Sequence, residues 1–262
     1  MFPLEIIGGG RMGEALLSGL LGADVVEAAD VVVVEVSADR RTQLVDLFPG
    51  VTVAETPVAA ADVVVATKPA GAADAVTAAV AAGAQRVLSI AAGVTTATLE
   101  AAAGTDLPVV RCMPNTPALV GQGASAVAAG THATADDLDW ARTVLGAVGL
   151  VVEVPEDQLD AVTGVSGSGP AYVFLFAEAL RDAGTAAGLP AKLSAQLALQ
   201  TVVGAAALLA DGQGTPEELR AAVTSPNGTT QAAIEKFEEL GLRQVVTQAV
   251  QAATDRSREL GA

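Results

Sequence analysis

Residues 4–21 are LEIIGGGRMGEALLSGLL, in which a short apolar run passes through a glycine-rich turn into helix-forming sequence. Gly8, Gly10 and Gly13 have the G-x-G-x-x-G spacing of a dinucleotide-binding turn. The first glycine permits the tight turn, the second lets a pyrophosphate approach the backbone, and the third lets helix and strand pack closely. Since strand, turn and helix come in the required order, the segment predicts an N-terminal Rossmann-type domain.

The alternation of strand and helix continues through the first 154 residues. Short runs rich in Val or Ile, each followed by Ala-rich or polar sequence, are expected at 4–7, 31–36, 62–66, 86–90 and 109–112, with further runs at 124–129 and 150–154. This rhythm is typical of βαβ units and a mostly parallel sheet.

The strand signals stop at Pro155. Helices are expected over about 157–187, 190–210, 215–222, 229–240 and 242–260. Residues 215–218 (TPEE) have the form of a capping box, which marks the start of a helix. We therefore expect an α/β protein with a Rossmann-type NAD(P)-binding domain over 1–154 and an all-α domain over 155–262.

The acidic composition limits the partners. The 262 residues carry 14 Lys and Arg against 30 Asp and Glu, a formal net charge of −16. Because nucleic acid and anionic membranes repel such a surface, both are poor candidates. Residues 193–210 are apolar and charge-free, but the polar residues among them favour a helix buried in protein over a membrane span.

Cysteine usage points to a reducing compartment. Cys112 is the single cysteine, which excludes an intrachain disulfide and a cysteine metal cluster in these residues. We expect no metal site. The N-terminal residues show no basic leader before an apolar stretch, so a cytoplasmic location is expected.

The helical half carries more apolar sequence than a lone bundle can hide. Residues 171–180 (AYVFLFAEAL) and 197–210 (LALQTVVGAAALLA) are the clearest cases. We expect a second subunit to cover them, which makes the helical half a dimerisation domain.

Three of the expected β-to-α turns carry residues of the kind that touch a cofactor. Residues 67–69 (TKP), 91–93 (AAG) and 113–117 (MPNTP) each follow an apolar run. They lie at the carboxyl ends of expected parallel strands, where open α/β sheets bind ligands. Two alternatives stay open: Lys68 is either a cofactor neighbour or a solvated loop lysine, and Asn115 either approaches the reacting ring or only shapes a proline turn.

Residues 223–230 (VTSPNGTT) form a charge-free octet between two helical stretches. Pro226 and Gly228 break the helix, and four hydroxyl side chains surround them. The N–H groups that begin the next helix are unpaired and lie at the positive end of its dipole, so the octet predicts a pocket for a small carboxylate or phosphate. An ordinary helix N-cap preceded by a turn is the alternative, because Ser, Thr and Asn are common caps.

Six motifs together resemble those of the pyrroline-5-carboxylate reductases, in this order and at about these spacings along the whole chain. They are GGGRMG (8–13), TKP (67–69), SIAAGVT (89–95), RCMPNTPALVGQGA (111–124), VTGVSGSGPAY (162–172) and VTSPNGTT (223–230). The resemblance implies reduction of the cyclic imine 1-pyrroline-5-carboxylate to L-proline by hydride transfer from NAD(P)H, the last step of proline biosynthesis. It also implies a homodimer with interlocked helical halves, in some members assembled into a larger ring.

The resemblance also implies roles for individual residues. Thr230 would place its hydroxyl against the ring nitrogen as the catalytic group, and Ser225, Gly228 and Thr229 would help it to bind the substrate carboxylate. Residues 166–170 would form a bend close to the nicotinamide, or else only a helix kink. The expected cofactor-binding residues are Gly8, Gly10, Arg11, Met12, Gly13, Ser37, Arg40, Lys68, Pro69, Ala91, Ala92, Gly93 and Asn115.

Two residues depart from the family pattern, and cofactor choice is divided. Arg11 stands where Asn is common, and Asn227 replaces the second residue of the usual S-P-G-G-T-T. Glu35, 22 residues after Gly13, is placed to hold a ribose 2′-hydroxyl and favours NAD. Ser37, Arg40 and Arg41, just beyond Glu35, could instead bind the 2′-phosphate of NADPH. We expect NADPH, with NADH as a possible alternative, and the hypothesis is that Arg40 or Arg41 discriminates.

Three other interpretations are open. The first is another small NAD(P)-dependent imine or β-hydroxyacid oxidoreductase, although such enzymes are expected to use a lysine on the helical domain. Lys192 and Lys236, the lysines of the helical half, lie outside the loop motifs. The second is a non-catalytic nucleotide-binding module. The third is a helical dimerisation scaffold, which leaves the glycine turn unexplained.

Overall fold

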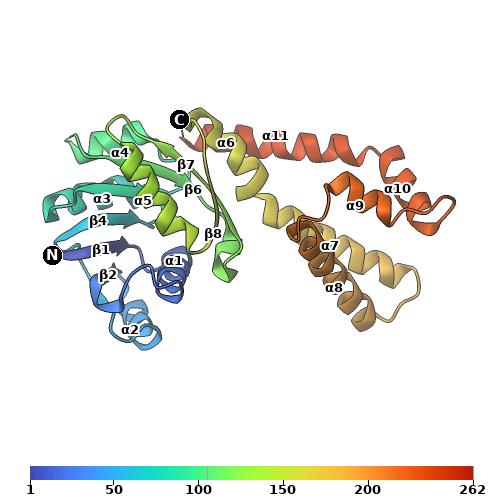
Figure 1. Ribbon diagram of the computed structural model, residues 1–262, viewed down its shortest axis with the longest axis horizontal. Helices are drawn as coiled ribbons and strands as arrows, with labels where there is room; N and C mark the ends of the chain where they lie inside the picture. The colour runs from blue at the N-terminus through green and yellow to red at the C-terminus, as the bar shows by residue number, and fades with distance from the viewer. Residues whose placement is uncertain (105, 262) are drawn as a thin grey trace. The chain divides into compact units, whose positions relative to one another are not determined.

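The computed structural model describes residues 1–104 and 106–261, and for Phe2 only the backbone. The chain divides into two compact units (Figure 1). The first holds residues 1–168 together with the chain from Gln251 onward, and the second holds Gly169–Val250. Residues 155–168 thus pack with the sheet, whereas the domain boundary expected from the sequence falls at 154/155; that boundary stays a prediction.

The first unit is built on a sheet of eight strands within the described residues. In the spatial order β3-β2-β1-β4-β5-β6-β7-β8, the strands from β3 to β6 are parallel, β7 runs antiparallel to β6, and β8 runs parallel to β7. The bounds are β1 Phe2–Ile7, β2 Val31–Val34, β3 Thr52–Ala54, β4 Ala60–Val65, β5 Arg86–Ser89, β6 Val109–Met113, β7 Gly123–Ala129 and β8 Gly149–Glu153. The mostly parallel sheet expected from the sequence is confirmed.

Helices cover both faces of this sheet. The larger cluster of buried side chains joins the strands to α1 (Arg11–Gly22), α2 (Ala38–Leu47) and α5 (Ala135–Gly146). A second cluster joins them to α3 (Ala72–Ala82) and α4 (Thr96–Ala103). Ile6 faces the first cluster and Ile7 the second, as the alternation of a strand requires. Strands buried on both faces explain why the central ones are continuous apolar runs.

The helix expected over residues 157–187 is not continuous, and its interruption overlaps the bend or kink expected at residues 166–170. The structure has a 3-10 turn at Glu156–Gln158, helix α6 (Leu159–Val162), a π-helical turn at Thr163–Gly167 and helix α7 (Gly169–Ala186). The interruption falls where the sequence is richest in residues that weaken a helix: glycine costs backbone entropy, and Pro170 lacks an N–H. A π-helical turn of this kind is often found at functional sites.

The second unit is helical. It contains α7, α8 (Ala191–Ala210), α9 (Pro216–Ala222), α10 (Thr229–Glu239) and the first part of α11 (Leu242–Gly261). Helices α7 and α8 pack together, and Ser194 Oγ donates to the Arg181 carbonyl at 2.6 Å across that contact. The expected capping box is confirmed, since Thr215 and Glu218 cap each other's backbone at the start of α9.

Helix α8 is largely exposed within the single chain. Ser194 and Ala198 are buried, whereas Leu199 is 63% exposed and Val203 is 52% exposed. The expected burial of this helix in protein is therefore not met by one subunit. Among the described residues, α8 alone is long and apolar enough to span a membrane by length and composition.

Candidate active site

The glycine turn leaves the start of α1 open. Gly8 has a φ of 113°, and a Cβ there would lie 2.6 Å from the Ala66 carbonyl oxygen. A Cβ on Gly13 would collide with the Gly8 carbonyl oxygen, so helix and strand approach more closely than other residues allow. Gly10 is the N-cap of α1, receives no side-chain cap and has open space where its Cβ would point. Free N–H groups at a helix start form an anion site.

The turns after β4 and β5 flank the glycine turn, because β4 lies beside β1 and β5 beside β4. Thr67, two residues after the end of β4, has a buried hydroxyl without a hydrogen-bond partner among the described residues. An orphaned hydroxyl next to an open helix start fits a dinucleotide, which supplies both hydroxyl and phosphate groups. The expected cofactor residues of this edge are Arg11 and Met12 in the first turn of α1, Lys68 and Pro69 after Thr67, and Ala91, Ala92 and Gly93 after β5.

The adenosine end of such a ligand would lie beyond β2. Ser37 is the N-cap of α2, and its hydroxyl accepts from the Arg40 backbone N–H at 3.4 Å. The Arg40 guanidinium reaches back to the glycine turn, where Nε donates to the Gly9 carbonyl at 2.7 Å. Arg40 is thus attached to the glycine turn, and Ser37 is attached to Arg40.

Asn115 is buried and links the motif at residues 111–124 to the motif at residues 162–172 by hydrogen bonds. Its Nδ2 donates to the Ser166 carbonyl at 3.0 Å, and its Oδ1 accepts from the Ala124 N–H at 2.8 Å. A Cβ on Gly167 would lie 2.5 Å from the Met113 side chain, so the π-helical turn packs directly on the end of β6. With its amide committed to the protein on both sides, Asn115 positions the turn; its expected contact with the cofactor stays a prediction.

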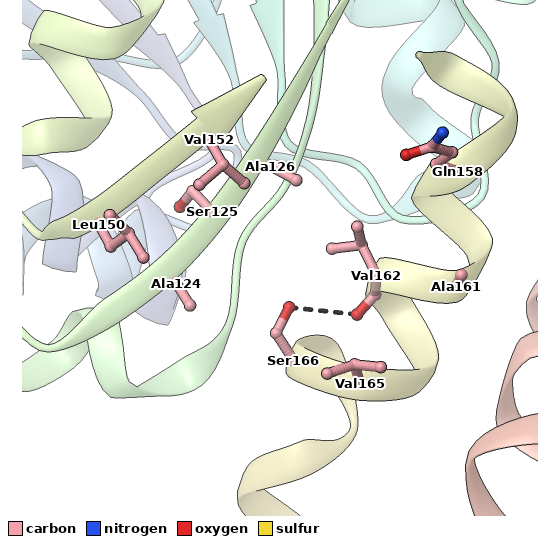
Figure 2. Close-up of a pocket in the computed structure, with 10 residues that line it drawn as sticks. All are labelled: Ala124, Ser125, Ala126, Leu150, Val152, Gln158, Ala161, Val162, Val165 and Ser166. Atoms are coloured by element: carbon pink, nitrogen blue, oxygen red, sulfur yellow. Dashed lines mark hydrogen bonds between the residues drawn. The ribbon is translucent and has the colours of Figure 1, made fainter. Parts of the chain in front are cut away.

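A groove of about 420 Å³ opens beside the π-helical turn (Figure 2). It lies between the strands β7 and β8 and the α6 segment, and its lining residues are Ala124, Ser125, Ala126, Leu150, Val152, Gln158, Ala161, Val162, Val165 and Ser166. The Ser166 hydroxyl is not a free donor for a ligand in this groove, because this hydroxyl donates to the Val162 carbonyl at 3.1 Å. The lining is mainly apolar, with Ser125, Gln158 and Ser166 as its polar residues, and it contains no charged side chain. The groove can therefore bury an apolar surface and does not itself supply a charged acid or base.

Glu156 ties the turn after β5 to β6. Its carboxylate accepts from the Thr96 N–H at 2.7 Å, from the Thr96 hydroxyl at 2.5 Å and from Arg111 Nη1 at 2.9 Å. Burial alone would raise the pKa of the Glu156 carboxyl, but the hydrogen bonds from Thr96 and the Arg111 charge lower it below the ordinary value. The role of Glu156 could not be predicted from the sequence, since no spacing rule links position 156 to positions 96 and 111.

Cys112 takes no part in chemistry. It is buried in β6, and burial raises the pKa of its thiol to about 12, which leaves it protonated and inert at neutral pH. Among the described residues, no group of three or more His, Cys, Asp or Glu side chains is placed to hold a metal ion.

The octet 223–230 lies wholly in the second unit and forms a tight turn before α10. Gly228 N donates to the Ser225 carbonyl at 3.0 Å, and Asn227 between them has a φ of 60°. Gly228 is the N-cap of α10 and no side chain caps that end. The hydroxyls do not cap the helix, but a turn before an N-cap residue is also what the ordinary N-cap interpretation expects, so the anion pocket stays a prediction. The helix start is open to an anion.

Within its own unit, each half of the chain therefore presents an open helix start. The first, at a glycine turn of a doubly wound sheet, suits a dinucleotide, and the second, beside hydroxyl groups and without charged side chains, suits a small carboxylate. A dinucleotide site and a carboxylate site are the two that an oxidoreductase with a nicotinamide cofactor and a small acidic substrate needs.

Comparisons with known proteins specify the class further. Residues 156–260 match the family model described as pyrroline-5-carboxylate reductase dimerisation, and residues 3–93 match that of NADP oxidoreductase, coenzyme F420-dependent. The chain is 42% identical to the pyrroline-5-carboxylate reductase of Corynebacterium melassecola, over 100% of this chain and 99% of that protein. It is 44% identical to the enzyme of Pseudomonas aeruginosa, over 98% and 96% of the two chains.

Solved structures agree. A pyrroline-5-carboxylate reductase from Coxiella burnetii superimposes with a TM-score of 0.93 at 34% identity, covering 100% of this chain and 99% of that one. The pyrroline carboxylate reductase of Plasmodium falciparum, solved with NADP bound, gives a TM-score of 0.83 at 27% identity, covering 100% and 98%.

The chain belongs to the pyrroline-5-carboxylate reductase family. It is an NAD(P)H-dependent oxidoreductase that reduces 1-pyrroline-5-carboxylate to L-proline in proline biosynthesis, and its helical half mediates homo-oligomerisation. The fold and activity expected from the sequence are confirmed. The roles of individual residues stay predictions.

Proposed function

We propose that the octet before α10 holds the substrate and that Thr230 is the catalytic residue of the reaction. The supporting observation is the uncapped start of α10, where Gly228, Thr229 and Thr230 bring backbone N–H groups to the positive end of the helix dipole. Ser225, exposed on the other side of the turn, adds a hydroxyl donor. Such a site binds the substrate carboxylate without Lys or Arg.

The reaction requires neither a metal ion nor a strong nucleophile from the side chains. Reduction of the imine adds a hydride to carbon and a proton to nitrogen, and the cofactor supplies the hydride. The chain has to orient the ring and support the nitrogen as it becomes an amine. In the proposal, the Thr230 hydroxyl donates a hydrogen bond to that nitrogen, while the N–H groups of the same helix start fix the carboxylate. Two attachments to one rigid element hold the ring in one orientation.

The cofactor role is proposed for the open edge of the sheet. Gly8, Gly10 and Gly13 would let the diphosphate reach the N–H groups of α1, with Arg11 and Met12 in the first helical turn. The Thr67 hydroxyl, unpartnered in the described residues, would bond to the cofactor. Lys68, Pro69, Ala91, Ala92 and Gly93 border the same edge, and Ser37 and Arg40 border the ribose end.

The proposed assembly is a homodimer, with a larger ring of dimers as the alternative that solution measurements would distinguish. The exposed apolar faces of α7 and α8 support a protein partner rather than a membrane for these helices. A cytoplasmic location is part of the same proposal, in keeping with an acidic chain that carries a single buried cysteine.

Replacement of Thr230 by Val tests the catalytic role. Loss of a positioned hydrogen-bond or proton donor is expected to lower kcat by about 100-fold, whereas Thr230→Ser retains most of it. NAD(P)H oxidation is followed with 1-pyrroline-5-carboxylate. Thr224→Val is the matched control, because the Thr224 hydroxyl points back to the end of α9, where it donates to the Arg220 carbonyl at 2.6 Å, and its loss should leave kcat near the wild-type value.

Two results would contradict the assignment. Wild-type kcat in Thr230→Val would remove the hydroxyl from the reaction and leave it at most a binding role. An equal loss in Thr224→Val and Thr230→Val would show that the turn as a whole, and no particular hydroxyl, had been disturbed.

A further inference from the structure

We propose that Glu35 determines cofactor choice and makes this chain bind NADH more tightly than NADPH. The inference rests on the proposed cofactor role of the glycine turn and extends it to the adenosine ribose. It departs from the expectation that Arg40 or Arg41 selects NADPH.

Glu35 is attached to the glycine turn itself. It directly follows β2, and its Oε2 accepts from the Gly9 N–H at 3.1 Å while its Oε1 accepts from the Ser37 N–H at 2.8 Å. A Cβ on Gly9 would lie 3.2 Å from the Glu35 Cβ, so the side chain packs against the turn. The carboxylate is thereby fixed between the loop that would hold the diphosphate and the start of α2.

A carboxylate in this position discriminates between the two cofactors. It offers about four lone-pair sites, of which the two N–H groups use two, so it can still accept hydrogen bonds from ribose hydroxyls. The 2′-phosphate of NADPH has no proton to donate in its ionised form and brings negative charge against Glu35. Like charges placed together at a binding site cost affinity.

The two arginines that could offset this repulsion are engaged elsewhere. Besides its bond to Gly9, Arg40 forms an ion pair with Glu14 in the first turn of α1 and donates to Gln43 at 3.1 Å. It neutralises an acid beside the proposed diphosphate site, and each of its three guanidinium nitrogens already has an acceptor.

Arg41 is similarly occupied. Its Nη1 donates to the carbonyls of Glu35 and Val36, at 2.9 Å each, and its Nη2 pairs with Glu55 at 3.2 Å. Arg41 therefore braces the backbone that presents Glu35. Glu14, Glu35 and Glu55 offset the charge of Arg40 and Arg41, so these five side chains carry no surplus positive charge for a 2′-phosphate.

Binding of NADH and NADPH to the intact homo-oligomer, measured by titration calorimetry without imine, tests the assignment. The wild-type Kd for NADH is expected to be at least about tenfold lower than that for NADPH. Glu35→Gln keeps the shape and one acceptor but removes the charge, and should reduce the NADPH-to-NADH ratio of Kd values by about tenfold, mainly through tighter NADPH binding. Glu153→Gln is the matched control: it removes a surface carboxylate that pairs with Arg142 and belongs to neither arginine of this cluster, and should leave the ratio unchanged.

Wild-type binding that favours NADPH, or favours neither cofactor, would overturn the proposal, as would an unchanged ratio in Glu35→Gln. A fall in NADPH affinity alone in Arg40→Gln would return the discrimination to that arginine and also overturn it. The wild-type ratio decides even if Glu35→Gln fails to fold. Preferential NADH binding without imine reduction would contradict the activity and still support the role of Glu35.

Discussion

Asn227 occupies a backbone conformation that most side chains avoid. Its φ of 60° is left-handed, where Gly is favoured and Asn is the best tolerated alternative. This explains how Asn can stand where the family commonly has Gly. Its N–H also donates to Gln231 Oε1 at 2.8 Å, which ties the turn to the first turn of α10.

Asn227→Val should strain this turn, because a β-branched residue pays about 1–3 kcal/mol in the left-handed region. We expect a raised KM for 1-pyrroline-5-carboxylate and a lower Tm, while Asn227→Gly restores the usual family residue and stays close to wild type. Steady-state kinetics and thermal melts compare the two variants. Equal KM values for Val and Gly would show that the turn tolerates the strain or does not hold the substrate.

Glu5 is a fully buried carboxyl in the middle of β1. Its Oε1 accepts from the Val58 N–H at 2.8 Å, whereas Oε2 has no hydrogen-bond partner among the described residues. Burial raises the pKa of the Glu5 carboxyl, and the bond from Val58 offsets only part of that increase. The folded protein therefore keeps this proton at pH values where the unfolded chain has lost it.

This difference has a definite sign. The ordinary pKa of Glu is about 4. As pH rises from this value through the raised pKa of Glu5, the free energy of unfolding falls. Glu5→Gln cannot ionise, so its stability relative to wild type should increase between about pH 4 and pH 7. Thermal melts at fixed protein concentration measure this difference. A constant difference across the range would mean that Glu5 titrates alike in both states.

At the scale of the element, Glu156 attaches the start of the helical segment to the sheet unit through its bonds to Thr96 and Arg111. Its lowered pKa means that the ionised carboxylate stabilises the fold above the unfolded-state pKa, and that this contribution is lost as pH falls through the lower folded-state value. Glu156→Gln should cost about 1–2 kcal/mol at neutral pH, because Arg111 is buried and loses its counter-charge. The cost should shrink below about pH 4.

Urea unfolding across this pH range measures the effect. Glu153→Gln serves as the control, since Glu153 pairs with Arg142 on the surface and such pairs contribute roughly 0–1 kcal/mol. A loss in Glu156→Gln that is no larger than in the control, or that does not depend on pH, would contradict the account of this ion pair.

Patterns within one element were predictable, and contacts between distant residues were not. The glycine spacing at 8–13 predicted both the turn and the close packing of α1, because each glycine meets a local steric requirement. The strand β3 was not predicted, because three residues are too few to show the alternation of apolar and polar side chains that indicates a strand. Asn115 bonds to Ser166, 51 residues away in sequence, and Glu156 bonds to Thr96, 60 residues away, which no local rule predicts.

The helical segment shows the same limit. A bend or kink was expected at residues 166–170, but the π-helical turn at Thr163–Gly167 was not, because its position depends on packing against Met113 as much as on glycine content. The octet before α10 was recognised as an open helix start, yet the left-handed Asn227 that shapes it could be placed only with the backbone in hand.

At the scale of the whole molecule, the exposed apolar surface of the second unit determines the assembly. A groove of about 520 Å³ runs along α7 and the start of α11, with an almost wholly apolar lining. Its lining includes Leu175, Phe176, Phe237, Val245 and Val246, several of which are about half exposed or more. A contiguous apolar surface of this kind marks a protein interface, and these residues lie in the segment that matches the dimerisation model.

Phe176→Glu places a charge in this groove and should shift the homo-oligomer towards monomers, since an interface with an unpaired buried charge loses several kcal/mol. Light scattering after size-exclusion chromatography measures the mass over a range of protein concentrations. Val45→Glu is the matched control: Val45 is 53% exposed on α2, outside the groove, against 46% for Phe176. Its mass should remain that of the wild type. If Phe176→Glu keeps the wild-type mass at low micromolar concentration, the groove is not the subunit contact, and the partner must instead cover the exposed face of α8.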